Sequence, residues 1–270
     1  MPRANRHFIP GQIWHITHRC HKRDFLLKFD KDRRAWTQWL HEAKLRFNLV
    51  VFNWIVTSNH IHLLLLDETG QEVIPRSIQL IAGRTAQGYN QRKRRKGAFW
   101  EDRYHATAIE AGSHLLRCLI YINLNMVRAG VVIHPSEWPF GGYNEIQSSG
   151  RGGGIIAHEK LAAFTGFQSY ETFKSAHNAW VNEALENGDN ARQSEWSESI
   201  GVGSKTFTLW IKEKLGIRAK GRSVMKSKGD GYHLREPTPC YNNNDDYLSY
   251  QESLKFQNCY FWELYEDATG

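Results

Sequence analysis

Short stretches in which apolar and polar positions alternate recur through the first half of the chain. In the first of them, Ile13, His15 and Thr17 alternate with their neighbours, as successive side chains of a strand do. The link Ser58-Asn59 between two such stretches is short, which favours an antiparallel pair of strands. The predicted strands are Gln12–Arg19, Val50–Thr57, His60–Leu66 and Tyr104–Ile109.

Apolar residues three and four positions apart lie between these strands and predict helices. Trp36, Leu40 and Ala43 would form one apolar face of a helix that begins at Asp30. Two further helices are predicted at about Pro75–Arg92 and Gly112–Ala129. The order strand, helix, strand, strand, helix, strand, helix predicts a ferredoxin-like α+β fold, with an antiparallel sheet and helices packed on one face.

A glycine-rich stretch after these elements predicts a domain boundary. We expect a catalytic domain at residues 1–147, a linker at 148–155 and a mainly helical region at 156–270. Two helices joined by a glycine-bearing turn near residues 195–216 could form a DNA-reading helix-turn-helix. The alternative, which we favour, is a helical pair that packs against the first domain, because this half of the chain is slightly acidic.

Charge is distributed unevenly along the 270 residues. Residues 1–150 carry 21 Lys and Arg against 12 Asp and Glu, whereas residues 151–270 carry 14 against 16. A basic half suits a polyanionic partner, although a solvated basic surface would have the same composition. The four cysteines show no Cys-x-x-Cys spacing, and a disulfide framework is implausible for 270 residues. We expect neither a signal peptide nor a membrane span, because no apolar run follows the first residues and no apolar stretch approaches the length needed to span a bilayer. We therefore expect a cytoplasmic protein in a reducing compartment.

The triplet His60-Ile61-His62 is the strongest chemical signal. Side chains two positions apart in a strand share one face, with Cα atoms about 6.6–7 Å apart, so both imidazoles could bind one cation. Many such triplets are ordinary half-buried strand positions. A zinc hydrolase acting on another substrate would use the same ligands, although no Cys or carboxylate nearby in the sequence favours zinc.

Tyr121 and Asn125 are four positions apart and would share one face of the third predicted helix. A phenol, a carboxamide and two imidazoles could then meet at one divalent cation. In a generic helix, Tyr121 would more often cover the core with its hydroxyl at the rim. Tyr104 is the rival nucleophile, but it has no polar residue one turn away. His15 could face the same sheet surface as His60 and His62 and assist them.

Several motifs follow one another along the first half of the chain. They are Pro10-Gly11 with His15 and Arg19, Ser58-Asn59-His60-Ile61-His62-Leu63-Leu64, Phe99-Trp100-Glu101-Asp102-Arg103-Tyr104, the segment from Tyr121 to Gly130, and Trp138-Pro139-Phe140 followed by Tyr143. Together these motifs resemble the HUH single-tyrosine transposases, and within them the REP-associated tyrosine transposases. The resemblance covers roughly residues 1–146, and Met126 stands where the family usually has proline. This departure leaves Tyr121 untouched.

The resemblance implies a single-stranded DNA endonuclease and strand transferase that acts at hairpin-forming repeats. By this resemblance His60, His62 and Asn125 would hold one divalent cation, Mg²⁺ or Mn²⁺, and Tyr121 would be the nucleophile that forms a 5′-phosphotyrosine. The expected partner is hairpin-forming single-stranded DNA rather than a membrane. The protein would be a cytoplasmic monomer or homodimer that is associated with the nucleoid when bound to DNA. The alternative is a binder or regulator of structured DNA that keeps the fold without the chemistry.

Basic and aromatic residues around these motifs are the candidate DNA contacts. A basic run between the second helix and the fourth strand would give salt-dependent affinity, although such runs are often solvated loops. Aromatic side chains interleaved with arginine could stack on unpaired bases. The candidates are Arg92, Lys93, Arg94, Arg95, Lys96, Trp100, Arg103, Tyr104, Arg128 and Arg19.

Overall fold

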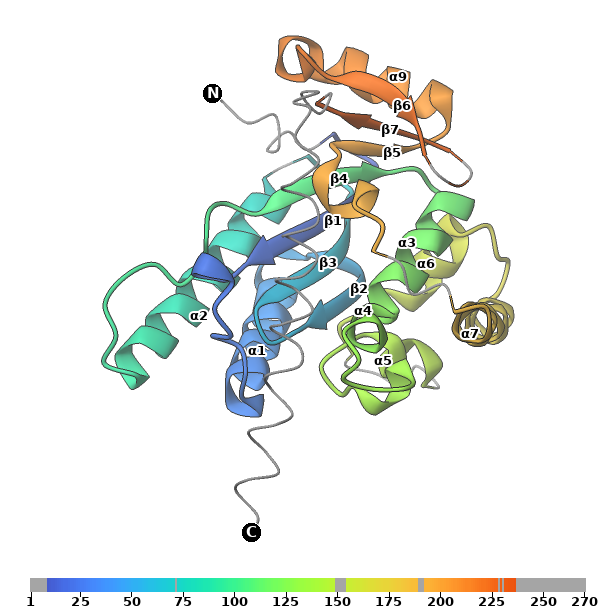
Figure 1. Cartoon of the computed structure of the whole chain (residues 1–270). Helices are drawn as coiled ribbons and strands as arrows, with labels where there is room; N and C mark the ends of the chain where they lie inside the picture. The colour runs from blue at the N-terminus through green and yellow to red at the C-terminus, as the bar shows by residue number, and fades with distance from the viewer. Residues whose placement is uncertain are drawn as a thin grey trace, which may run out of the picture. The chain divides into compact units, whose positions relative to one another are not determined.

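A computed structural model describes residues 9–70, 72–148, 154–188, 192–227, 229 and 231–236. Every described residue belongs to one compact unit, Met1–Glu236. A seven-stranded sheet runs through this unit in the order β2-β3-β1-β4-β5-β7-β6 (Figure 1). Within the described ranges, no helix combines the length and apolar character needed to cross a membrane. The strands are β1 (Gln12–Arg19), β2 (Val50–Val56), β3 (His60–Asp67), β4 (His105–Ile109), β5 (Gly201–Gly203), β6 (Ser223–Lys226) and β7 (Tyr232–Arg235).

The first four strands confirm the predicted α+β sheet, with each predicted boundary within one residue of the observed one. β1 pairs antiparallel with both β3 and β4, and β3 pairs antiparallel with β2. β3 lies between two strands and is apolar on both faces from Leu63 to Leu66, so those four side chains are buried. This buried strand holds the His triplet at its first three positions.

The helices divide between the two faces of this sheet (Figure 1). Neighbouring residues of β2 point to opposite faces. The ring of Trp54 lies 6.5 Å from that of Trp36 in α1, whereas the carboxamide of Asn53 bonds that of Asn123 in α3. The expectation that the helices share one face is therefore wrong for α3. The helices that matter here are α1 (Asp30–Phe47), α2 (Val73–Arg92), α3 (Ser113–Asn123), α4 (Asn125–Arg128), α5 (Tyr143–Gln147), α6 (His158–Phe164), α7 (Tyr170–Glu186), α8 (Glu195–Glu198) and α9 (Lys205–Leu215).

The third predicted helix, Gly112–Ala129, is interrupted. Leu124, with φ −79° and ψ 5°, separates α3 from the short α4, so Tyr121 lies in the last turn of one helix and Asn125 begins the next. The apolar pattern continues through this interruption, which is why periodicity alone predicts a single helix.

The chain after the glycine-rich stretch extends the same sheet. β5 pairs in parallel with β4, and β6 and β7 continue the sheet beyond it. On the other side, the amide of Ala157 donates to the carbonyl of Val51 at the edge of β2 (2.8 Å). Both edges of the first four strands are thus covered by later segments, because unpaired strand edges need partners. The domain boundary expected at residues 148–155 is therefore not where the structure divides the chain.

Residues 195–216 do not form a helix-turn-helix. Strand β5 lies between α8 and α9, and α8 has only one helical turn. α9 packs on β5 and β7 with Ile211 and Leu215 buried. The observed order is helix, strand, helix and β-hairpin, and the remainder of the predicted helical region, 237–270, lies outside the described residues.

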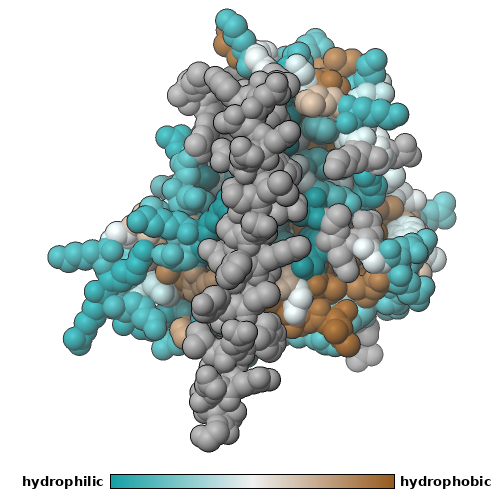
Figure 2. Space-filling model, in the orientation of Figure 1, coloured by the Kyte–Doolittle hydropathy of each residue, from teal (hydrophilic) through white to brown (hydrophobic). Residues whose placement is uncertain are grey.

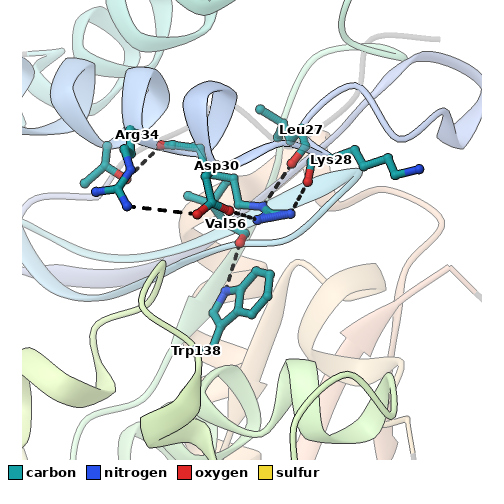
Figure 3. A network of polar contacts seen from close by, with 8 residues as sticks. Leu27, Lys28, Asp30, Arg34, Val56 and Trp138 are labelled. Carbon is teal, nitrogen blue, oxygen red and sulfur yellow. Dashed lines mark hydrogen bonds and ion pairs between the residues drawn. The ribbon is translucent and has the colours of Figure 1, made fainter. Parts of the chain in front are cut away.

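A buried arginine, Arg33, joins the start of α1 to the motif Trp138-Pro139-Phe140. Its partners Leu27 and Asp30 are labelled in Figure 3, together with Trp138. Arg33 donates to the carbonyl of Leu27 at 3.0 Å and to the carboxylate of Asp30 at 2.9 Å. Its guanidinium lies 4.7 Å from the ring centre of Trp138, whose indole N–H donates to the carbonyl of Val56 at 3.1 Å. This motif therefore fixes the end of β2 and the start of α1, and it does not reach Tyr121 through any of these contacts.

Candidate functional site

Strand pairing brings the His pair together with a third histidine. Residues that face each other across an antiparallel pair project from the same face. Thr17 of β1 faces His62, Arg19 faces His60, and His15 lies on this same face two positions before Thr17. The expectation that His15 shares the surface of the pair is confirmed. This face is the one that α3 covers.

His60 is held through its Nδ1 atom. Nδ1 lies 2.7 Å from Asn59 Oδ1 and 2.9 Å from Thr57 Oγ1. The Thr57 hydroxyl itself donates to the carbonyl of His60 at 2.9 Å, so it accepts at the imidazole. A carboxamide oxygen and an accepting hydroxyl require a donor, so the ring hydrogen lies on Nδ1. The lone pair of His60 Nε2 therefore points away from Thr57 and Asn59.

His62 is also held through Nδ1. Its Nδ1 atom lies 2.8 Å from His15 Nε2, and its Nε2 atom lies 3.1 Å from Asn125 Nδ2. The second nitrogen of His15 lies 2.8 Å from the main-chain carbonyl oxygen of Trp196 in α8. His15 is fully buried and His62 is 3% exposed. Burial lowers the pKa of His15 to about 4, so this imidazole is neutral near pH 7.

Tyr121 lies beside this pair of rings. Its ring centre is 6.0 Å from that of His62 and 6.3 Å from that of His15, both edge to face. The tyrosine is 7% exposed, and the ring of Trp196 lies 6.1 Å away. Burial raises the pKa of the phenol, whereas Arg128, Arg192 and a hydrogen bond with Ser197 lower it. The phenol therefore faces the imidazoles in a site that α8 covers.

Three arginines give this site a positive potential. Burial, and after it the charges of Arg19, Arg192 and Arg128, together lower the pKa of His60 to about 3. Arg128 also lies over the Tyr121 ring, with its guanidinium carbon 4.2 Å from the ring centre. Arg192 forms an ion pair with Glu198 at 3.0 Å. Cations gathered around a neutral imidazole suit an anionic ligand such as a phosphodiester.

The side chains present fit a divalent cation, for which Asn125 would be the third ligand. Both histidines keep an Nε2 lone pair, and their Nδ1 atoms are held by neighbours, as is typical of imidazoles that bind metals. Turning the Asn125 carboxamide would present Oδ1 where Nδ2 now lies, since the two orientations are nearly indistinguishable by shape. Among the described residues, no group of three or more His, Cys, Asp or Glu side chains is placed to hold a metal ion. A cation here would therefore use a mixed set of two imidazoles and one carboxamide.

The structure brings only some of the candidate DNA contacts to Tyr121. Arg19 and Arg128 lie at the site, whereas Arg92 at the end of α2 pairs with Asp32 of α1, across the sheet from Tyr121. Lys93, Arg94 and Lys96 are exposed, and hydrophilic side chains project where α2 ends (Figure 2). Arg95 is half-buried and bonds the carbonyl of Ala98 (3.0 Å), while Arg103 is exposed.

The aromatic candidates lie on the opposite sheet face, near the end of β1. Trp100 stacks on His18 with ring centres 4.1 Å apart, and its indole donates to the carbonyl of Ala82. Tyr104 lies edge-on to the same His18 at 6.3 Å. The alternation of side chains along β1 places His18 on the face opposite His15. Tyr104 is therefore separated from His60 and His62 by the sheet, which disfavours it as the nucleophile.

Sequence reasoning missed the residues of the later segment that complete the site. Arg192, Trp196 and Ser197 act on Tyr121 or on the histidines. They lie in an acidic stretch with no motif, and 181 positions separate Trp196 from His15. The one local signal is a tryptophan isolated among polar residues, which is fully buried.

Comparison with known proteins finds a family for the first part of the chain. Residues 10–125 match the model of the family described as IS200-like transposases. This part of the chain is similar to the IS200-like transposases. The match begins before β1 and ends at Asn125, so it includes His60, His62 and Tyr121. The resemblance expected from the sequence is confirmed for this segment, and the match excludes α8.

Two solved structures are similar to part of this chain. One is described as a REP-associated tyrosine transposase bound to a REP hairpin, with 21% identity, a TM-score of 0.48, and coverage of 58% of this chain and 94% of that one. The other is described as a candidate transposase from Deinococcus radiodurans R1, with 21% identity, a TM-score of 0.33, and coverage of 43% and 89%. None of the curated proteins compared with the chain matches it.

Proposed function

We propose that this chain is a transposase-like, metal-dependent single-stranded DNA endonuclease and strand transferase that acts at hairpin-forming repeats. The observation that carries the proposal is the position of the Tyr121 ring, 6.0 Å from that of His62. Asn125 bonds His62 from the same side, and Arg128 lies over the tyrosine. The nucleophile, the three candidate metal ligands and the Arg128 guanidinium thus lie close together.

Tyr121 performs the covalent step of the proposed reaction. Its phenolic oxygen attacks the phosphorus, so an O–P bond forms to the tyrosine while the bond from phosphorus to the 3′ oxygen breaks. The phenol gives up its hydrogen to water, and the departing 3′ oxygen takes one up as a hydroxyl. The resulting 5′-phosphotyrosine is attacked by the 3′-hydroxyl of another strand, so joining needs no ATP.

The other residues prepare the phosphodiester for attack. Arg19, Arg128 and Arg192 attract the phosphate. Arg128 and Arg192 also lower the cost of a negative phenolate at Tyr121. His60, His62 and Asn125 would hold Mg²⁺ or Mn²⁺. When bound, such a cation neutralises the non-bridging oxygens as charge develops.

The test is a labelled oligonucleotide that carries a hairpin beside a single-stranded flank, incubated with Mn²⁺ or Mg²⁺. We expect cleavage and a covalent protein–DNA adduct on a denaturing gel, and no cleavage after EDTA treatment. Tyr121→Phe should abolish both products and preserve binding, whereas the matched Tyr104→Phe variant should keep both. Undiminished cutting by Tyr121→Phe, or full activity in EDTA, would overturn the proposal.

One observation favours a second candidate function. Tyr121 is 7% exposed and its hydroxyl bonds Ser197, so α8 covers the nucleophile. A protein that binds structured DNA without cutting it would tolerate such a cover. In that case hairpin DNA would bind, but no adduct would form under any metal condition, and Tyr121→Phe would behave like the unaltered protein.

A further inference from the structure

A chain of hydrogen bonds runs from the later segment of the protein into the proposed metal site. The carbonyl oxygen of Trp196 lies 2.8 Å from His15 Nδ1, and His15 Nε2 lies 2.8 Å from His62 Nδ1. The two imidazole planes differ by only 12°, with centres 5.0 Å apart, so the rings lie nearly in one plane. Each ring therefore meets the next through its nitrogens.

The direction of this chain is fixed at the carbonyl end. A carbonyl can only accept, so His15 Nδ1 carries the ring hydrogen. Because a neutral imidazole has one such hydrogen, His15 Nε2 must accept from His62 Nδ1. His62 Nε2 is then left with its lone pair, at the atom that Asn125 contacts.

Another residue that bonds the Trp196 carbonyl does not change this direction. The hydroxyl of Thr107 lies 3.1 Å from the same carbonyl, but it lies closer, at 2.6 Å, to the carbonyl of Ser199. A hydroxyl has one hydrogen, which the shorter contact takes. The lone pairs of the Trp196 oxygen therefore remain available to His15.

We propose that His15, held by the main-chain carbonyl of Trp196, is a positioning residue that keeps His62 with its hydrogen on Nδ1 and its Nε2 lone pair directed at the cation. The inference rests on the metal-binding part of the proposed function. It also gives α8 a role, since Trp196 lies outside the segment that matches the transposase family. Without His15, His62 is free to adopt the other tautomer, which removes the lone pair from the metal side.

Long-range ¹H–¹⁵N imidazole spectra of the metal-free, full-length protein test the tautomer directly. We expect His62, assigned from the spectrum of a His62→Gln variant, to show a hydrogen on Nδ1 and none on Nε2. In His15→Leu the signal should shift toward the Nε2–H form. His15→Gln should restore the original pattern, because its carboxamide can both donate to the carbonyl and accept from His62.

Calorimetric titration with Mn²⁺ gives a second readout that does not depend on DNA cleavage. Loss of a residue that orients a metal ligand typically weakens metal affinity about 10–100-fold, and we expect this for His15→Leu. The matched control is His18→Leu, on the same strand and 7% exposed, whose imidazole bonds the carbonyl of Asp102 at 2.9 Å on the opposite face. It should leave the Mn²⁺ affinity unchanged.

Two results would overturn the positioning role, and they differ from failure of the proposed function. The first is an Nε2–H tautomer of His62 in the unaltered protein. The second is unchanged Mn²⁺ affinity in a folded His15→Leu variant. If the unaltered protein bound no Mn²⁺, the metal-binding part of the proposed function would fail, and the tautomer spectra alone would decide the role of His15.

Discussion

The guanidinium of Arg128 donates to the main-chain carbonyl of Tyr121 at 2.6 Å and also lies over the ring of the same residue. Tyr121 is in the last turn of α3, where carbonyl groups lack the following amides of a continued helix. Arg128 is the last residue of α4, and its guanidinium reaches back to the last turn of α3. One side chain thus both caps the helix end and places a positive charge beside the phenol.

Arg128→Leu should therefore slow cleavage and change its pH dependence. Arg128 lowers the pKa of the Tyr121 phenol, so its removal raises that pKa and moves the rising limb of the rate profile to higher pH. At pH 7 we expect a loss on the order of 10²-fold, as for other single groups that stabilise developing charge. Arg128→Lys, which keeps the charge, should retain most of the rate. If the rate of the Arg128→Leu variant rose over the same pH range as that of the unaltered protein, Arg128 would not act on the phenol.

The sequence was sufficient for the strands that carry the His pair. The alternation in Gln12–Arg19 depends on neighbouring residues alone, and the observed β1 has the same bounds. The position of Tyr121 beside His62 follows less directly, because it needs the sheet and α3 to pack as they do. The family resemblance supplied that step rather than periodicity.

The contribution of α8 could not be predicted from the sequence. A four-residue helix has too few positions to show a period, and its contacts join segments far apart in the chain. The same reason explains the missed strand β5, whose Gly201-Val202-Gly203 gains its partner only once β4 offers an edge. Both α8 and β5 are placed by an edge or a face that the first four strands leave uncovered, so neither can be predicted from neighbouring residues.

The exposed members of the basic run provide a test of DNA binding away from Tyr121. Replacing Lys93, Arg94 and Lys96 together by Ala should weaken hairpin binding and make it less dependent on salt. The slope of log affinity against log salt concentration should become shallower by roughly 0.7–0.9 for each phosphate that the variant no longer neutralises. The measurement is affinity at several salt concentrations. Arg92 is left intact because it pairs with Asp32.

The matched control is a second set of exposed lysines, Lys205, Lys212 and Lys214 of α9, replaced in the same way. This variant removes the same charge and should leave the salt slope close to that of the unaltered protein. An equal reduction in both variants would mean that overall charge, and not the basic run, controls binding.

Asn123 connects α3 to the sheet and to α7. Its Oδ1 accepts from Asn53 Nδ2, and its Nδ2 donates to His177 Nε2, both at 2.8 Å. Asn123→Ala would leave two buried polar groups unsatisfied, which costs about 1–3 kcal/mol each in the free energy of unfolding. Chemical denaturation should show this loss. Asn144→Ala, at an exposed position whose side chain bonds the carbonyl of Ser136, should cost less than about 1 kcal/mol. Equal losses in the two variants would contradict the role of the buried network.

His177 should make the folded state sensitive to acid. Burial lowers its pKa to about 4, below the ordinary value of 6.5 that applies when the chain unfolds. Between these values the unfolded state binds more protons, so stability is fully present above about pH 6.5 and falls as the pH drops toward 4. At roughly 1.4 kcal/mol per pKa unit, this residue alone accounts for about 2–3 kcal/mol between pH 7.5 and 4.5.

Comparing denaturant midpoints of the unaltered protein and His177→Gln at these two pH values separates this effect from general acid sensitivity. The glutamine can keep a contact with Asn123 or Gln147, which flank the imidazole at 2.8 Å, but it does not titrate. We expect the variant to be less stable at pH 7.5 and to lose less stability on acidification than the unaltered protein. Burial also lowers the pKa values of His15 and His18 to about 4, so both proteins should still lose some stability at low pH. Identical losses on acidification would show that His177 takes up no proton on unfolding in this range.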